Sequence, residues 1–192
     1  MPAASDGEDE QVAAALNHHH LLSEYAERAD VLPVRYGTAF SSEDRLIRNM
    51  SATEQTLAAA LQALRNRREY LLTIRQDQGE RPPTPTETGR GFLTAKRELR
   101  EARRMRGARR AAFLDQLLGQ IRTLAVAADP TRPLSSERGF GAALLVDLSA
   151  VEPLYETLSQ AGQAAEALDL SIRLTGPGPC YSFAVLPEVT DG

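Results

Sequence analysis

The chain has 192 residues, a hydrophobic share of 42% and a formal net charge of −4. This length suits one ordinary domain or two small ones, and the apolar share is enough for a core. The negative charge excludes a general attraction to nucleic acid or anionic membranes. The first ten residues are acidic, unlike a secretory signal, and no apolar run approaches the roughly 20 residues that span a bilayer. We therefore expect a cytoplasmic protein.

An acidic, disordered lead is expected over residues 1–8, followed by an amphipathic helix from about Glu10 to Ala29. The next segment, Val31–Phe40, is a short apolar run. Pro33 withdraws a backbone donor and Gly37 permits a sharp exit, so the run cannot be a long helix. We predict one strand, with its proline on an unpaired side.

Helical periodicity returns after this strand. Ser41 with Asp44, and Ser51 with Glu54, match the capping-box pattern of helix N-termini. The pattern predicts either one helix with a break near Met50 or two helices in succession.

Alternation of apolar and polar residues over Glu69–Arg75 predicts a half-buried strand. Asp77–Gly91 has three prolines, three glycines and no large apolar residue, which predicts a linker or mobile loop. A long helical pattern then runs from Phe92 to about Ala127 and is weakest at Gly107. A loop containing Pro and Ser is expected over Asp129–Gly139.

The C-terminal part has the most regular pattern. Ser149 with Glu152 forms a further capping-box pattern at the start of a helix. The Gly-Pro-Gly-Pro stretch at Gly176–Pro179 is expected to form a rigid turn. It is a poor phosphate-binding loop, because each of its two prolines lacks the backbone N–H that would bind the anion. We expect strands over Phe140–Leu148, Leu168–Thr175 and Tyr181–Leu186, a helix from Ser149, and a turn at Gly176–Pro179. This order predicts an α+β unit with helices over one sheet face.

Candidate catalytic and metal-binding residues are few. His18, His19 and His20 are consecutive, and side chains about 100° apart on a helix do not converge on one ion. We interpret them as a solvated or partly packed helix face. Cys180 is the single cysteine, which excludes an internal disulfide. A small hydrolase that uses Cys180 with a histidine is the most remote alternative, so we predict no catalytic residue, metal or cofactor.

A basic run is the strongest unexplained feature of the sequence. Lys96–Arg110 contains eight Lys or Arg against Glu98 and Glu101, a net of +6, so the remainder of a −4 chain carries −10. A solvated helix of good helix formers would explain it. So would a contact with an acidic partner or with the chain's own acidic surface. Nucleic acid is less favoured, because no aromatic residue interleaves the arginines. The candidate contact residues are Arg103, Arg104, Arg109 and Arg110.

Three motifs in order give a resemblance to a known family. They are Val31–Phe40 (VLPVRYGTAF), Gly91–Lys96 (GFLTAK) and Leu174–Phe183 (LTGPGPCYSF). The chain resembles the GvpL/GvpF family of gas vesicle proteins from about residue 16 to residue 186. The resemblance implies a non-enzymatic, gas vesicle associated protein that contacts the main shell protein and other accessory proteins during vesicle formation. A ferredoxin-like N-terminal domain joined to a C-terminal α+β domain is the implied fold.

The sequence departs from the family pattern in two ways. Gly178 and Cys180 replace the tryptophan and second proline of the usual turn. A strand-helix-strand portion that usually precedes the helix ending at Ala29 is missing, which suggests an N-terminally shortened member. We expect a remnant ferredoxin-like domain (helix-strand-helix-strand), a long helix and a C-terminal strand-helix-strand-strand unit. The expected divisions are 1–8 lead, 9–76 N-terminal domain, 77–91 linker, 92–187 C-terminal domain and 188–192 tail.

Partner binding through exposed apolar strand edges is the preferred hypothesis. The candidate contacts outside the basic run are Arg35, Tyr36, Tyr181 and Phe183. All four also suit core positions, which are favoured for Phe183. A two-stranded sheet is marginal in water. We therefore expect Val31–Gly37 to borrow neighbours from the C-terminal unit, a second copy or a partner chain. The alternative function is a binding module whose basic helix engages an acidic partner or nucleic acid.

Overall fold

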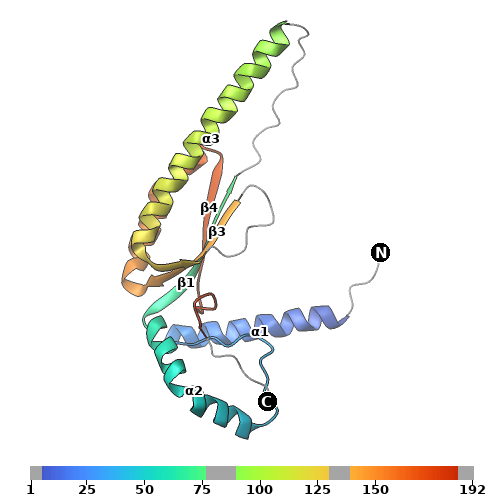
Figure 1. The fold of residues 1–192 in the computed structure, drawn as a ribbon, viewed down its shortest axis with the longest axis vertical. Helices are drawn as coiled ribbons and strands as arrows, with labels where there is room; N and C mark the ends of the chain where they lie inside the picture. The colour runs from blue at the N-terminus through green and yellow to red at the C-terminus, as the bar shows by residue number, and fades with distance from the viewer. Residues whose placement is uncertain (1–5, 77–89, 130–138, 186–192) are drawn as a thin grey trace. The chain divides into compact units, whose positions relative to one another are not determined.

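The computed structural model describes residues 6–76, 90–129 and 139–185. The expected linker and the loop before residue 139 lie almost wholly outside these ranges. The helices are α1 (Asp6–Arg28), α2 (Glu43–Leu64), α3 (Arg90–Leu124) and α4 (Val151–Glu166), the last preceded by a 3-10 turn, η1 (Leu148–Ala150) (Figure 1). The strands are β1 (Arg67–Gln76), β2 (Ala125–Asp129), β3 (Gly139–Asp147) and β4 (Leu170–Gly178).

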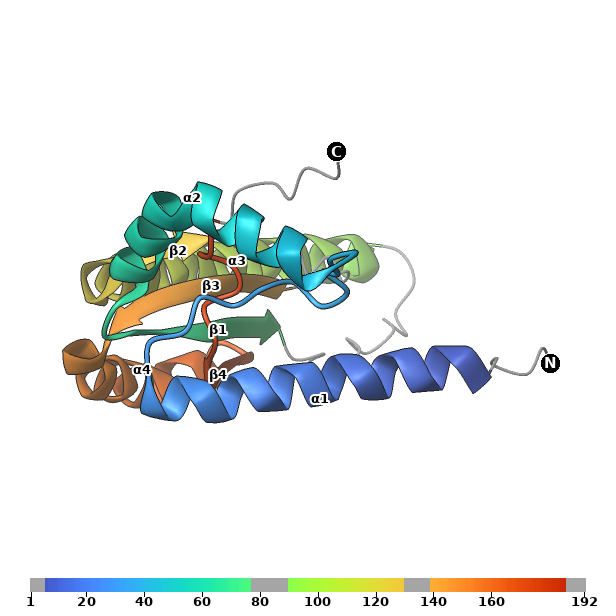
Figure 2. The ribbon, with the colours of Figure 1, turned by 90° about the horizontal axis from the view of Figure 1, so that it is seen from below.

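One antiparallel sheet holds the four strands in the order β2-β3-β1-β4, which Figure 2 shows from top to bottom. The chain order β1-α3-β2-β3-α4-β4 with this strand order is a ferredoxin-like arrangement. The predicted α+β class is confirmed. The expected grouping of the strands is wrong, because β1 does not belong to a separate N-terminal remnant. It lies between β3 and β4, where both of its edges are paired.

The chain divides into two compact units that are discontinuous in sequence. Within the described residues, the first unit holds 6–70, 145–148 and 176–185, and the second holds 71–76, 90–129, 139–144 and 149–175. Strands β1, β3 and β4 contribute residues to both units. The domain boundaries proposed from the sequence, 9–76 and 92–187, stay predictions.

The core of the second unit forms where α3 and α4 contact each other. Among the described side chains of α3, the buried apolar ones are Leu117 and Ile121, which lie in its second half one helical turn apart. They join Leu154 and Leu158 of α4 and the buried strand residues Leu72, Ile74, Ala142, Ala143 and Leu144. Burial of each Leu or Ile side chain contributes about 1.5–3 kcal/mol, so this half of α3 is fixed by its packing.

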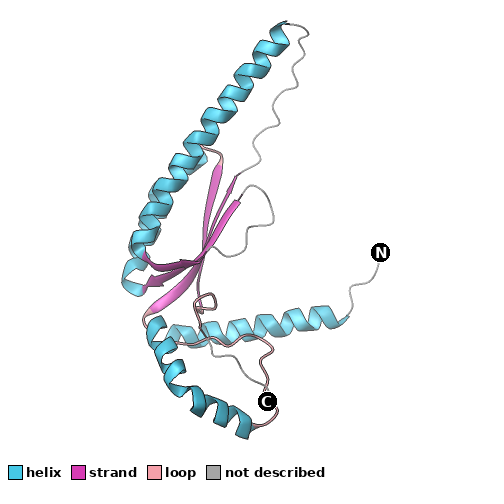
Figure 3. Ribbon diagram, in the orientation of Figure 1, coloured by secondary structure: helices cyan, strands magenta, loops and turns pink. Residues whose placement is uncertain are grey.

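The predicted strand at Val31–Phe40 is wrong. The segment is a loop between α1 and α2 (Figure 3). His18 Nε2 donates to the Val34 carbonyl at 3.1 Å, so α1 takes up a backbone acceptor that a neighbouring strand would otherwise use. Pro33 is buried, and Gly37 turns the chain at φ +86°. The apolar run therefore packs as a loop and needs no borrowed strand.

Helix α2 begins one residue later than the capping pattern predicts. The Ser42 hydroxyl, and not that of Ser41, accepts from the Arg45 backbone N–H at 3.3 Å. The helix continues without a break near Met50, because its apolar period is maintained through Ser51. The second predicted cap at Ser51 is therefore wrong.

Two other local predictions fail on the C-terminal side of α3. The helix predicted to reach Ala127 ends at Leu124, and Ala125–Asp129 forms β2. Alanines are good helix formers, so the local sequence favours a helix. The segment forms a strand because it pairs with β3, and the local sequence gives no sign of that pairing. Similarly, α4 begins after η1 with Ala150 as its N-cap and no side-chain cap bond, so Ser149 does not act as predicted.

The last predicted strand, Tyr181–Leu186, is also wrong within its described residues. Strand β4 continues to Gly178, past the point where the turn was expected, and Tyr181–Phe183 forms a turn. The backbone N–H of Ser182 donates to the Glu69 carboxylate at 2.8 Å, and the Ser182 hydroxyl donates to its other oxygen at 2.9 Å. The Glu69 side chain therefore binds the Ser182 backbone N–H that strand pairing would have used.

Candidate partner interface

An apolar groove lies in the first unit between α1, the following loop and α2. Its volume is about 960 Å³. Side chains from all three segments line it, among them Leu22, Tyr25, Val34, Met50, Leu57 and Leu61. We refer to this feature as the apolar groove.

Several lining side chains of the apolar groove are more exposed than core residues. Tyr25 is 59% exposed, Met50 52%, Val34 42% and Leu61 38%. Single exposed apolar residues are ordinary on a protein surface, but a contiguous set around a groove marks a place where a partner binds. The groove is therefore the best candidate interface in the described part of the chain.

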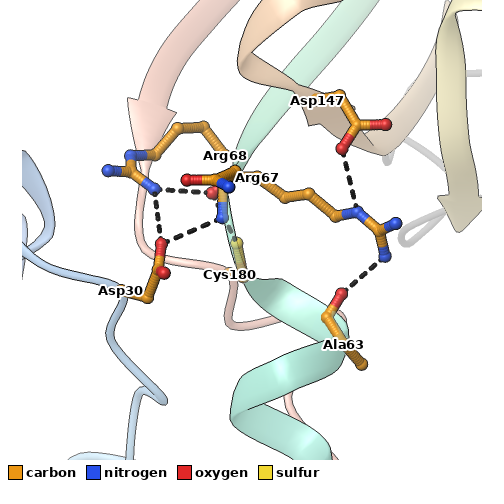
Figure 4. Close-up of polar contacts among 7 residues, drawn as sticks. Asp30, Ala63, Arg67, Arg68, Asp147 and Cys180 are labelled. Atoms are coloured by element: carbon orange, nitrogen blue, oxygen red, sulfur yellow. Dashed lines mark hydrogen bonds and ion pairs between the residues drawn. The ribbon is translucent and has the colours of Figure 1, made fainter.

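Arg68 contacts both the end of α1 and Asp30 in the groove-lining loop that follows; Figure 4 shows the contact with Asp30. Its guanidinium donates to the Ala26 carbonyl at 2.5 Å and lies 3.7 Å from the Asp30 carboxylate. The same carboxylate accepts from the Asn66 backbone N–H at 3.0 Å. The Arg68 and Asp30 side chains are only 16% and 26% exposed, so these charge-assisted bonds are little weakened by water.

Arg67 makes a second set of contacts at the end of α2 (Figure 4). Its Nη1 donates to the Ala63 carbonyl at 2.6 Å, and its Nε donates to the Asp147 carboxylate at 3.1 Å. Together the two arginines tie the ends of both groove helices to the start of β1. The ends of both groove walls are therefore held by polar contacts, one of which uses Asp30, a lining residue of the groove.

The predicted aromatic contacts lie beside consecutive histidines of α1. The Tyr36 ring centroid is 5.8 Å from that of His18, and the Tyr181 ring centroid is 5.9 Å from that of His19. Tyr36 is 50% exposed and Tyr181 is 36% exposed. Burial, and next the charge of Glu69, raises the pKa of Tyr181, so its hydroxyl stays neutral at physiological pH. Neither tyrosine lines the apolar groove.

The other two predicted residues near these segments differ in exposure. Arg35 is exposed, and its carbonyl accepts from the backbone N–H and hydroxyl of Thr38 at 3.2 and 2.9 Å. Phe183 is half-buried, and its N–H donates to the Cys180 carbonyl at 3.3 Å. Arg35 is thus available to a partner, whereas Phe183 is mostly used by the fold.

The four predicted arginines of α3 fall into two groups. Arg103, Arg104 and Arg109 are exposed and form no ion pair with another described residue. Arg110 is only 16% exposed, and its guanidinium donates to the Leu168 carbonyl and the Asp169 carboxylate, both at 2.6 Å. Arg110 therefore binds the chain's own acidic surface and holds α3 to the segment between α4 and β4.

Comparison with known families places these features in context. The family model described as gas vesicle synthesis protein GvpL/GvpF matches residues 2–185. The chain belongs to the GvpL/GvpF family. It is accordingly a gas vesicle protein, and the family predicted from its three motifs is confirmed. No curated protein sequence matches this GvpL/GvpF member.

Solved structures of gas vesicle proteins share its fold. GvpF from Anabaena sp. PCC7120 matches with a TM-score of 0.67 and 17% identity, over 90% of this chain and 75% of that one. GvpF from Microcystis aeruginosa matches with a TM-score of 0.64 and 17% identity, over 96% of this chain and 81% of that one. In the described part of this GvpL/GvpF member, none of the helices has the length and apolar character needed to cross a membrane.

Cys180 has the environment of an unreactive thiol. It is 4% exposed, and its Sγ lies 3.9 Å from the Arg67 carbonyl. Burial, and next the charge of Glu69, raises the pKa of Cys180 to about 11. The thiolate is the nucleophilic form of cysteine, so this environment disfavours the hydrolase alternative. Among the described residues, no group of three or more His, Cys, Asp or Glu side chains is placed to hold a metal ion.

The thiol of the folded protein should react slowly. At pH 8 a pKa near 11 in place of 9.0 lowers the thiolate fraction about 100-fold. Modification by a disulfide reagent should therefore be about 100-fold slower in the native protein than in denaturant. Because the folded pKa is the higher one, the free energy of unfolding should also fall as the pH rises from about 9 to 11. Cys180→Ala should reduce that fall, and rapid modification of the native protein would contradict the assignment.

The residues of the apolar groove were missed as a site by sequence reasoning. Leu22, Tyr25, Met50, Leu57 and Leu61 lie in the two segments that were predicted as helices from their apolar period. The signal that could have identified them is an excess of apolar helix surface in this part of the chain. Residues 9–76 contain two amphipathic helices and only two predicted strands, so the apolar faces of the helices exceed what that part of the chain can cover.

Proposed function

We propose that this GvpL/GvpF member is a non-enzymatic accessory of gas vesicle formation that binds the main shell protein through the apolar groove. The observation that carries the proposal is the set of exposed apolar side chains around the groove, Tyr25, Val34, Met50 and Leu61. An apolar shell subunit aggregates in water unless its apolar surface is covered. An accessory protein that covers this surface until assembly needs an exposed apolar groove of its own.

The groove suits an amphipathic helix of the partner. Two of its walls are helices, and a third helix can place apolar side chains at i, i+3, i+4 and i+7 between them. Burial of apolar surface contributes about 25 cal/mol per Å², so covering a few such side chains supplies several kcal/mol before the entropic cost of association.

Pairing with a sheet edge is the less favoured route. The edge strands are β2 and β4. Strand β2 has only five residues, and Pro177 in β4 lacks a backbone donor. The loop Val31–Phe40, which was expected to offer an edge, is not a strand. Tyr36, Tyr181 and Arg35 remain proposed contacts at the border of the interface, for the shell protein or for another accessory protein.

Co-purification tests the proposal. The tagged protein should capture the main shell protein when the two are co-expressed, whereas the tag alone should not. Since the groove is apolar, the complex should survive 500 mM NaCl, at which exposed charge pairs are screened within about 4 Å. Failure to capture the shell protein at low salt would contradict the function, and a complex lost at 500 mM NaCl would contradict the groove as its site.

A further inference from the structure

The first half of α3 is exposed to an unusual extent. Every side chain from Lys96 to Arg109 is exposed except that of Leu99, which is half-buried. We refer to Lys96–Arg109 as the basic stretch. In Figure 1 this part of α3 continues beyond the strands of its unit, unlike the second half of the helix, which buries Leu117 and Ile121.

The basic stretch is electrostatically unfavourable as an isolated helix. Arg100 and Arg104 are four positions apart, and Arg103, Arg106 and Arg109 follow one another at spacings of three. Like charges at these spacings destabilise a helix, and helices in proteins owe most of their stability to packing. In the described structure only Arg106, at 3.7 Å from Asp169, has an acidic partner among these five. Arg100, Arg103, Arg104 and Arg109 therefore form no ion pair with another described residue.

One face of the basic stretch combines charge with apolar surface. Four arginines and one glutamate border a hollow of about 700 Å³ that also includes Met105 and Ala108; the charged residues are Arg97, Arg100, Glu101, Arg104 and Arg109. Met105 is 54% exposed. A surface that complements this face must be acidic and must also present apolar side chains.

The first unit of the same protein presents such a surface. Asp9, Val12 and Leu16 lie at spacings of three and four on one face of α1, and Glu10 is adjacent. All four are exposed, Val12 by 59% and Leu16 by 62%. The described residues of the first unit contain 12 acidic and 7 basic residues, a net of −5, whereas those of the second contain 8 acidic and 12 basic, a net of +4.

We propose that the basic stretch of α3 binds the acidic N-terminal half of α1 on a second copy of this chain. Arg100 and Arg104 pair with Asp9 and Glu10, and Met105 meets Val12 and Leu16. The two surfaces belong to different units, so the contact between two copies is heterologous. A copy that binds through its α3 can still bind a further copy through its own α1. The protein therefore associates head to tail. This interface is separate from the apolar groove and from the proposed function.

Light scattering after gel filtration of the full, nuclease-treated chain tests the proposal. At 50 mM NaCl the mass should rise with concentration above that of a monomer, and 500 mM NaCl should weaken association at least about 10-fold, because the contact depends on charge. A monomer at 50 mM NaCl and about 200 µM protein would overturn the proposal. So would assemblies that disappear on nuclease treatment, since nucleic acid would then be the partner.

A charge swap identifies the two surfaces. The double variants R100E/R104E and D9K/E10K should each weaken self-association at least about 10-fold, and an equimolar mixture of the two should restore it. Arg122→Glu, on an exposed position of α3 outside the basic stretch, is the control and should leave association unchanged. Loss of association in the control, or no recovery in the mixture, would overturn the assignment. Circular dichroism establishes that each variant is folded.

Discussion

Met50→Glu should reduce capture of the main gas vesicle shell protein at least about 10-fold. Met50 lines the apolar groove and is 52% exposed, so the substitution leaves the free protein folded. A bound partner would have to desolvate the new carboxylate without an opposite charge, and a loss of 1.4 kcal/mol is already tenfold in affinity. The measurement is the dissociation constant, or the captured fraction, at a fixed salt concentration.

Ile47→Glu provides a matched control on the same helix. Ile47 is 54% exposed and lies one turn before Met50, but it does not line the groove. The same change of size and charge should therefore alter capture less than about 2-fold, because its ΔΔG stays within about 0.4 kcal/mol. Equal losses in the two variants, or no loss in Met50→Glu, would reject the groove as the binding site.

Leu72→Ala should lower the free energy of unfolding by about 2–5 kcal/mol. The Leu72 side chain is 0% exposed, and β1 lies inside the sheet between β3 and β4. Truncation removes apolar burial and leaves a cavity that paired strands on both sides prevent from collapsing. Denaturant unfolding followed by circular dichroism measures the change.

Leu71→Ala is the control, since it is the same substitution one residue away. Leu71 is 42% exposed and points to the opposite face of β1. Its truncation should cost less than about 1 kcal/mol, because partly exposed positions lose little burial. A cost for Leu71→Ala equal to that for Leu72→Ala would show that β1 is not packed as described.

Elements with a strong local period were predicted well from the sequence. The alternation over Glu69–Arg75 identified β1, and Tyr70, Leu72 and Ile74 are its buried residues. Helices α1 and α3 followed from their apolar periods. Each of these predictions depends only on the spacing of apolar side chains within one segment that has one buried face. That spacing can be read directly from the sequence.

Features set by contacts between distant segments could not be predicted in this way. The pairing of β1 with β3 and β4 leaves no local mark, and neither does β2, whose alanines suit a helix. The loop Val31–Phe40 is apolar like a strand, but a bond from His18 replaces strand pairing.

The contact residues proposed from the sequence stay predictions. Tyr36 and Arg35, which are exposed, were proposed as contacts beside the exit of the predicted strand. The residues of the apolar groove were not, because an apolar helical period looks the same whether a core covers it or not. Arg110 was grouped with its neighbours, although a carboxylate 59 positions away engages it.

The central position of β1 also governs the order of events during synthesis. Its neighbours β3 and β4 are made later, and Ser171 of β4, whose hydroxyl lies 3.5 Å from the Arg75 carbonyl, is 96 positions further along the chain. At translation rates of about 5–20 residues per second, β1 waits roughly 5–20 s for β4 with an unpaired edge. Both groove helices have left the ribosome by then. Sheet formation is thus a late, non-local step, and nascent chains that stop before Gly178 expose a strand edge prone to aggregation.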